Sequence, residues 1–185
     1  MRLLVAAMDV EMVAFTEPID GFDTLVTGLG KLQAAVGLTK ALSAQTYEEI
    51  VVVGTAGALD PELEASVYEV VSALQHDVAD LDGVVGQHVA LPATVGSSRD
   101  GLTIATGDRF IDDADTVTHI RALGASLVDM ETYAYMWTAE SFGVPIRVFK
   151  AVSDRAQDGA TELWDVTVTR CSGWLRERIR VEYGV

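Results

Sequence analysis

Leu127-Val128-Asp129-Met130-Glu131-Thr132-Tyr133-Ala134 joins an apolar, strand-like approach to a helical pattern, with two carboxylates at the junction. Ligands of α/β proteins bind where the carboxyl ends of strands meet the amino ends of helices. We therefore expect Asp129 and Glu131 to lie beside a small polar ligand. Helix capping is the alternative, since an acidic residue stabilises the exposed N–H groups of a first turn. Capping accounts for one carboxylate better than for two.

Apolar runs and helical patterns alternate on both sides of this segment. The runs typical of strands cover residues 2–7, 23–27, 50–53, 67–74, 102–106, 125–129 and 146–152. The patterns typical of helices cover residues 31–45, 114–122, 131–142 and 161–180, and residues 80–101 are irregular, with room for one edge strand. This alternation predicts the α/β class: one domain over residues 1–185, with three layers, α/β/α, around a central mixed sheet that is mostly parallel.

The composition limits the classes of partner. The 185 residues carry 28 acidic and 13 basic side chains, for a net charge of −15. Such a surface repels phosphate groups, which argues against nucleic acid and anionic membranes and leaves a neutral small molecule compatible. No apolar run is long enough to span a bilayer.

Hydropathy and cysteine content bear on assembly and location. Hydrophobic residues make up 49% of the chain and the mean hydropathy is +0.25. This richness indicates apolar surface buried between subunits, so we expect a homodimer or a higher homo-oligomer. Cys171 is the one cysteine in the sequence. An internal disulfide is therefore impossible, which suits a cytoplasmic location.

Small or polar residues follow several predicted strands. Glu11, Thr55, Asp108, Glu131 and Asp154 all lie just beyond such a run. If the strands are parallel, their carboxyl ends share one edge of the sheet, and these side chains converge on one crevice. This convergence predicts a binding site for a small molecule.

The glycine-containing segments need separate interpretation. We read residues 54–58, Gly-Thr-Ala-Gly-Ala, as a turn that lets a ligand approach the backbone. Gly28-Leu29-Gly30 does not fit a dinucleotide fingerprint, because Gln33 stands at the third glycine position. Lys31 does not fit a phosphate-binding loop, because Leu32 replaces the required Ser or Thr. His76, Asp77 and Asp80 on one loop, with no second His or Cys cluster, are weak evidence for a metal site, so we expect neither metal nor cofactor.

Several short motifs, taken together in chain order, resemble those of the purine nucleoside phosphorylase/nucleosidase superfamily. The greater likeness is to its methylthioadenosine/S-adenosylhomocysteine nucleosidase branch, and it extends over nearly the whole chain. The motifs are Ala7-Met8-Asp9-Val10-Glu11, Thr27-Gly28-Leu29-Gly30-Lys31, Gly54-Thr55-Ala56-Gly57-Ala58, His76-Asp77-Val78-Ala79-Asp80, Gly107-Asp108-Arg109-Phe110-Ile111, Asp129-Met130-Glu131 and Val152-Ser153-Asp154.

The resemblance implies roles on the sugar. Glu131 would accept hydrogen bonds from the ribose 2′- and 3′-hydroxyls, and Met130 would pack against the sugar. Glu11 would hold the attacking water. Trp164 lies where the family places an aromatic cap over the 5′ end of the sugar.

The resemblance also implies roles on the base. Asp154, steadied by Ser153, would face N7 of a purine. Phe110 would stack on the base, and Ile111 would contact it through its backbone. The residues that match the family's glycine turn, Thr55, Ala56 and Gly57, belong to the same substrate-binding set.

The implied reaction, hydrolysis of an N-glycosidic bond, assigns a protonation state to each carboxyl group. Asp154 can protonate the departing base only if burial raises its pKa. Glu131 should stay ionised to stabilise the cationic sugar, and Glu11 must be ionised to take a proton from water. One acid and one base on opposite sides of the bond repeat the logic of inverting glycosidases, without a metal.

Other readings stay open from the sequence. Glu11 could be an early-helix acid, and Phe110 and Trp164 could be core aromatics. Residues 8–15 and 50–53 lack the arginines that hold phosphate in phosphorylases, which favours hydrolysis, although Arg109 and Arg155 keep phosphorolysis as an alternative. A non-catalytic nucleoside-binding protein of the same fold is a further alternative.

The substrate stays open as well. Thr55 replaces the family's serine, Ala58 replaces its second glycine, and the segment over 80–101 is shorter than in the family. Methylthioadenosine, adenosylhomocysteine, a futalosine-like nucleoside, adenosine and inosine all remain candidates.

Overall fold

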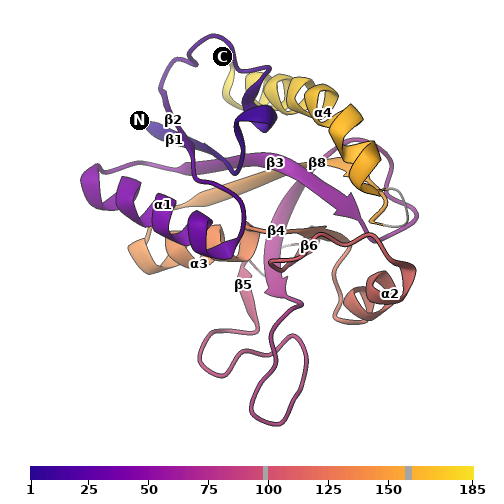
Figure 1. Cartoon of the computed structure of the whole chain (residues 1–185). Helices are drawn as coiled ribbons and strands as arrows, with labels where there is room; N and C mark the ends of the chain where they lie inside the picture. Colours follow the sequence, from indigo (N-terminus) through magenta and orange to yellow (C-terminus); the bar gives the residue numbers. More distant parts are fainter. Residues whose placement is uncertain (98–99, 157–159) are drawn as a thin grey trace.

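The computed structural model describes residues 1–97, 100–156 and 160–185, and the side chains of residues 160–166 lie outside the described part. Figure 1 shows the helices and strands. The strands are β1 (Arg2–Ala6), β2 (Phe22–Val26), β3 (Ile50–Ala58), β4 (Val67–Gln75), β5 (Thr94–Gly96), β6 (Leu102–Thr106), β7 (Leu127–Asp129) and β8 (Ile146–Asp154). The helices are the 3₁₀ helix η1 (Asp9–Met12) and the α-helices α1 (Lys31–Ala44), α2 (Ala114–Ala122), α3 (Thr132–Phe142) and α4 (Ala160–Tyr183).

The strands form one mixed sheet that closes partly on itself. Neighbouring strands follow the order β2-β1-β3-β7-β6-β4-β5, and β8 bridges β3 and β4. A closed ring of five strands, β3-β8-β4-β6-β7, therefore stands at the centre of the sheet. Within the described ranges, five strand pairings are parallel and three are antiparallel. The α/β class and the mostly parallel mixed sheet are as predicted.

The sheet contains two sets of parallel strands that run in opposite directions. Strands β3 and β7 are antiparallel and pair over two residues each, at the carboxyl end of β3, where Gly57 pairs with Val128 and Ala58 with Leu127. Strand β3 and strand β7 thus approach the place where they pair from opposite directions. The predicted convergence at the carboxyl ends is correct, but it arises from two opposed half-sheets and not from one shared edge.

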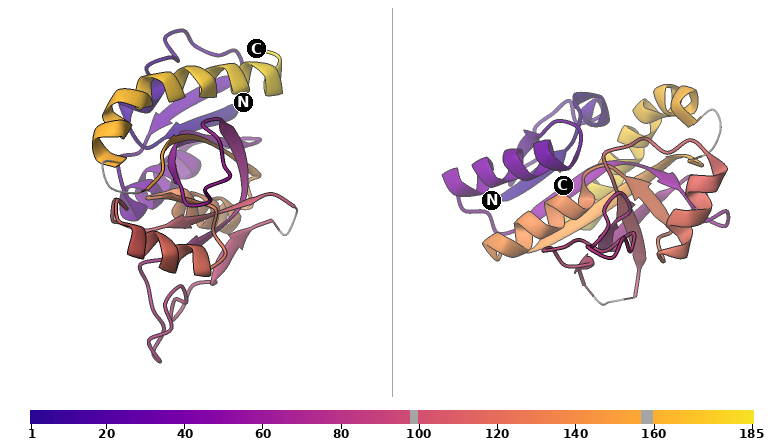
Figure 2. Two further views of the ribbon diagram at one scale, coloured as in Figure 1. Left: turned by 90° about the vertical axis from the view of Figure 1, so that its right-hand side faces the viewer. Right: turned by 60° about the horizontal axis from the view of Figure 1, so that its bottom comes forward.

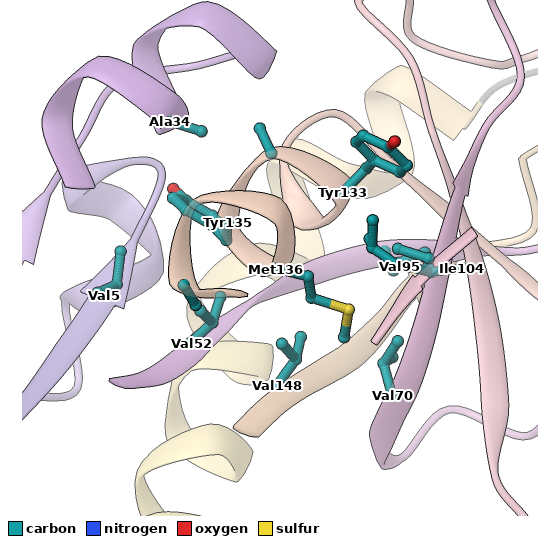
Figure 3. Packing of buried hydrophobic residues seen from close by; sticks show 14 of the residues in the cluster. Val5, Ala34, Val52, Val70, Val95, Ile104, Tyr133, Tyr135, Met136 and Val148 are labelled. Atoms are coloured by element: carbon teal, nitrogen blue, oxygen red, sulfur yellow. The ribbon is translucent and has the colours of Figure 1, made fainter. Parts of the chain in front are cut away.

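The helices cover the sheet on two sides. Helices α1 and α3 lie side by side on one face, and α4 lies on the other face against β8 (Figures 1 and 2). Figure 3 shows how α3 packs on the sheet: Met136 points toward Val70 and Val148. Helix α3 is apolar nearly all round because α1 covers the side that the sheet leaves open.

The turn predicted over residues 54–58 is wrong. Strand β3 runs from Ile50 through Ala58, with a register shift between Ala56 and Gly57. Strands β8 and β7 supply hydrogen-bond partners to this stretch, so the small residues need not turn. They make room instead: a Cβ on Gly54 would lie 2.9 Å from the Lys150 ammonium.

Smaller features complete the comparison with the predicted elements. The irregular segment contains the edge strand β5, which pairs with β4, and part of the connection between these two strands projects from the body of the molecule (Figures 1 and 2). Across the described ranges, no helix combines the length and apolar character that crossing a bilayer requires.

Candidate active site

A cavity of about 380 Å³ opens where β3 and β7 meet, a size suited to a small ligand. The site residues predicted from the sequence line it, with two exceptions: Asp108 is not among the lining residues, and the side chain of Trp164 lies outside the described residues. The lining set is Ala7, Met8, Glu11, Leu29, Thr55, Ala56, Gly57, Arg109, Phe110, Ile111, Val128, Asp129, Met130, Glu131, Ser153 and Asp154. Residues from six segments of the chain therefore share one cavity.

Glu11 is held by four hydrogen bonds. Its Oε2 accepts from the backbone N–H groups of Ala7 and Met8, both at 3.2 Å. Its Oε1 accepts from the Thr55 N–H at 2.7 Å and the Thr55 hydroxyl at 3.0 Å. The side chain is buried, and every partner is a donor, so the site matches a carboxylate and not a carboxylic acid. Glu11 thus combines the helix-start position with a place in the cavity.

Asp129 is a structural residue, as the capping alternative proposed. One oxygen accepts from the Thr106 hydroxyl at 2.7 Å, and the other accepts from the N–H and the hydroxyl of Thr132 at the start of α3. The Lys150 ammonium lies 3.0 Å from the second oxygen, and both side chains are almost fully buried. Asp129 therefore caps α3 and neutralises a buried lysine.

Glu131 is left to face the cavity. Its Oε1 accepts from the Gly30 N–H at 2.8 Å, across 101 residues of sequence. Burial and the nearby Asp129 together raise the pKa of Glu131 to about 7, while Lys150 opposes the rise. Without a ligand, Glu131 is therefore only partly ionised near neutral pH, and its ionisation while it holds the sugar stays a prediction. One ammonium faces the three carboxyl groups of Glu11, Asp129 and Glu131, so burial and like charge favour the protonated form of Glu131, which has few hydrogen-bond donors.

Asp154 ends β8 on the other side of the cavity. Its Oδ2 accepts from the Ser153 hydroxyl and its Oδ1 from the Ala156 N–H, both at 2.8 Å. Burial raises the pKa of Asp154, and these two hydrogen bonds oppose the rise without cancelling it. The raised pKa agrees with the expectation for a general acid. Ala156 adopts φ 49°, a strained conformation for a residue with a side chain, to deliver its N–H.

Gly57 supplies the space beside this carboxyl group. A Cβ there would lie 3.1 Å from Asp154 Oδ1 and 3.0 Å from the Ala156 Cβ. Any larger residue at position 57 would push the carboxyl group from its place.

The loop after β6 forms the remaining wall. Phe110 is 39% exposed, whereas Ile111 is buried. An aromatic side chain this exposed at a cavity is not a core aromatic, which favours a role against a ligand. Arg109 lines the same wall and pairs with Asp113 at 3.2 Å. Arg155 does not line the cavity; it donates to the Pro61 carbonyl at 2.9 Å.

Lys150 and Gly30 are the residues that the sequence analysis missed. Lys150 carried a usable signal, because a lysine inside the apolar strand 146–152 must be buried with an anion. Gly30 acts through a backbone N–H directed by φ +90°, and no side chain marks that role in the sequence. The absence of a side chain is itself required, because a Cβ would lie 2.8 Å from Asp108 Oδ1.

Comparison with known proteins now adds to this geometry. The sequence profile of the phosphorylase superfamily matches residues 24–179. The 5′-methylthioadenosine/S-adenosylhomocysteine nucleosidase of a Marinomonas species is 31% identical over 168 residues, covering 77% of this chain and 72% of that protein. The enzyme of the same name from Bacillus subtilis is 30% identical over 155 residues, covering 71% and 67%.

Solved structures share the fold at lower identity. Futalosine hydrolase of Helicobacter pylori aligns with a TM-score of 0.87 and 19% identity, covering 97% of this chain and 95% of that one. The 5′-methylthioadenosine/S-adenosylhomocysteine nucleosidase of Neisseria meningitidis, in complex with methylthio-immucillin-A, aligns with a TM-score of 0.85 and 21% identity, covering 96% of both chains.

The chain belongs to the phosphorylase superfamily. Its fold is the nucleoside phosphorylase/hydrolase-like α/β fold. Within that superfamily it is a nucleosidase, an enzyme that hydrolyses N-glycosidic bonds.

Proposed function

We propose that this nucleosidase cleaves purine nucleosides of the methylthioadenosine or adenosylhomocysteine kind into free base and sugar. One observation carries the proposal: Glu11, Glu131 and Asp154 come from distant parts of the chain and line one cavity. Water attacks C1′ and gives its proton to Glu11, the C1′–N9 bond breaks, and N7 of the leaving base receives the proton of Asp154. The reaction balances without a cofactor.

The sugar is held by Glu131 and Met130 in this proposal. The 2′- and 3′-hydroxyls are donors and prefer the ionised form of Glu131. Since the pKa of the empty-site carboxyl is about 7, nucleoside binding draws the group into its ionised form. The carboxylate then lies beside the sugar as positive charge develops on it.

The base is held between Phe110 and the end of β8. The raised pKa of Asp154 supports its role as the acid, because burial favours the protonated form. Ser153 and the Ala156 N–H fix the direction of that carboxyl group. Ile111 offers its backbone to the edge of the purine.

Glu11 is the proposed base for the attacking water. Its two oxygens accept from four donors, and Thr55 fixes Oε1 against the end of β3. The backbone of Ala56 and Gly57 lines the same wall. Trp164 remains the proposed cover for the 5′ end of the sugar.

The cations near the cavity favour water over phosphate as the second substrate. Among the described residues that line the cavity, Arg109 is the one basic side chain, and it is paired with Asp113. Lys150 forms an ion pair with Asp129 beneath the cavity. A phosphate dianion would face Glu11 without a compensating cation.

Assembly and cellular context extend the proposal. Leu32 is 79% exposed and Leu81 is 89% exposed, and such apolar side chains support a homodimer or larger homo-oligomer. Light scattering after gel filtration would test the assembly. The single, buried Cys171 supports a cytoplasmic location. With a 5′-thio nucleoside as substrate, the enzyme would serve methionine salvage.

A substrate panel tests the function. Methylthioadenosine, adenosylhomocysteine, adenosine, inosine and a futalosine-like nucleoside are incubated with the protein, with and without phosphate, and free base is measured. We expect phosphate-independent release of adenine, fastest from a 5′-thio nucleoside. Strict dependence on phosphate would make the protein a phosphorylase, and binding without release would make it a non-catalytic nucleoside-binding protein. Either result contradicts the proposal.

A further inference from the structure

Three residues outside the reacting groups form a closed set of contacts, which we name the Lys31–Asp77–Asp108 triangle. The Lys31 ammonium donates to Asp77 Oδ1 at 2.6 Å. The Asp108 N–H donates to Asp77 Oδ2 at 2.8 Å. The Lys31 N–H donates to Asp108 Oδ1 at 2.8 Å. Each residue therefore contacts both of the others.

The triangle joins the two loops that carry the sugar and base contacts. Lys31 follows Gly30, whose N–H holds Glu131 at 2.8 Å. Asp108 precedes the Arg109-Phe110-Ile111 wall of the cavity. Asp77 lies after β4 and bridges the two loops. These loops are 77 residues apart in sequence, and they meet both through Asp77 and directly, where the Lys31 N–H donates to Asp108.

Local capping explains why Asp108 is needed. Helix α1 begins after Gly30, which has no side-chain cap, and its first turn contains no acidic residue. Asp108 accepts from the first N–H of the helix and so replaces the missing cap from another loop. The short distance from Asp108 Oδ1 to Gly30 also keeps position 30 free of a side chain.

Within the triangle, the ionised form of Asp77 is favoured. Lys31 and Asp77 are 17% and 25% exposed, so solvent screens their attraction only in part. Burial opposes ionisation of Asp77, but the hydrogen bonds from Lys31 and from the Asp108 N–H outweigh it and lower the pKa of Asp77. Gln75 adds a further acceptor for the Lys31 ammonium at 2.9 Å.

We propose that the triangle is a positioning device that fixes the Gly30 N–H on Glu131 and aligns the sugar side of the cavity with the Phe110–Ile111 wall. The inference rests on the proposed function, since it assigns sugar and base to these two walls. Lys31, Asp77 and Asp108 need not touch substrate. They act through the backbone of the residues beside them.

The test compares Asp77→Asn and Lys31→Met with the wild type, and uses Lys31→Arg as the conservative rescue. Glu69→Gln is the matched control, because it weakens a similarly exposed ion pair, Glu69–Arg147, far from the cavity. For each protein we measure kcat and KM for methylthioadenosine, urea unfolding, and binding of formycin A, a C-nucleoside that hydrolysis cannot cleave, between pH 5 and 8.

We expect Asp77→Asn and Lys31→Met to lower kcat/KM by about 10- to 100-fold, because small displacements of reacting groups are costly. The pH midpoint of formycin A binding moves upward, since loss of the Gly30 hydrogen bond leaves Glu131 facing Asp129, Glu11 and Lys150 without its donor. Lys31→Arg keeps most of the wild-type kcat/KM and a pH midpoint of formycin A binding near that of the wild type. Glu69→Gln loses stability but keeps the wild-type midpoint and kcat/KM.

A purely structural role predicts a different pattern. If the triangle variants change only the urea midpoint, as the control does, the inference is overturned. If the wild type cleaves no purine nucleoside, the proposed function fails instead, and the formycin A midpoint still tests the triangle. Should Asp77→Asn fail to fold, the comparison of Lys31→Met with Lys31→Arg decides the matter alone.

Discussion

The two walls of the cavity use carboxyl groups in opposite ways. The sugar wall gathers Glu11, Asp129 and Glu131 around one buried ammonium, that of Lys150. The base wall holds a single carboxyl group, Asp154, which has two hydrogen-bond donors and no ion pair among the described residues. The same chemical group thus meets a crowded charge cluster on one side and an isolated, buried position on the other.

The difference shows that donor number, more than burial, separates the roles. Glu11 and Asp154 are both about 5% exposed. Glu11 accepts four hydrogen bonds and suits a base, whereas Asp154 accepts two and keeps a raised pKa that suits an acid. Glu131 accepts a hydrogen bond from the Gly30 N–H and has a pKa of about 7, so its ionisation depends on the ligand.

Glu11→Gln removes the base and should have the largest effect. An amide cannot take a proton from water, so we expect kcat to fall by about 10⁴-fold while formycin A still binds. Adenine release and calorimetric binding measure the two quantities. Glu62→Gln, at an exposed position, is the control. Unchanged turnover would remove Glu11 from the mechanism.

Asp154→Asn removes the acid from the base wall. We expect a loss of about 10³-fold in kcat for methylthioadenosine, because N7 of adenine no longer receives a proton. A nitrophenyl riboside has a leaving group that needs no protonation, so its cleavage should fall far less. Equal losses for both substrates would mean that Asp154 positions the substrate and does not act as an acid.

Lys150→Met tests the charge balance of the sugar wall. The variant leaves Asp129 buried without its ion pair, and we expect the free energy of unfolding to fall by about 3 kcal/mol. Urea titration measures this change, with the exposed Lys40→Met as the control. Loss of the ammonium should also raise the pKa of Glu131, because Lys150 normally lowers it. A stability equal to that of the wild type would show that the cluster needs no cation.

The pH dependence of binding tests Glu131 at a smaller scale. Ribose hydroxyls donate to the carboxylate, so affinity for formycin A should rise with pH until about 7 and then level off. Below that point it should weaken by about tenfold per pH unit. Glu131→Gln should bind weakly and without this pH dependence. A flat profile for the wild type between pH 5 and 8 would contradict the role of Glu131.

Much of the fold follows from periodicity in the sequence. Helix α2 was predicted over its observed residues, and α1 and α3 to within one residue at each end, because apolar spacing and the glycine after α3 mark them. The stretch Gly54–Ala58 was misread because small residues resemble a turn until the partner strands on both sides are known. The antiparallel pairing of β3 with β7 is likewise a long-range contact, which local sequence patterns do not predict.

The candidate site, like the fold, could be predicted only in part from the sequence. The family motifs pointed to Glu11, Glu131 and Asp154, and all three line the cavity. They did not reveal the raised pKa of Glu131, because that pKa depends on Asp129, Lys150 and the depth of burial together. Contacts made by backbone groups, such as the Gly30 N–H, leave no mark on residue type.

The crystal structure of Glu11→Gln with bound methylthioadenosine tests the central claim most directly. The account predicts that Asp154 lies within about 3.2 Å of N7 and that Glu131 contacts both ribose hydroxyls at similar distances. A water molecule should lie between residue 11 and C1′. A nucleoside bound outside this cavity, or bound with N7 turned away from Asp154, would contradict the assignment of three carboxyl groups to one glycosidic bond.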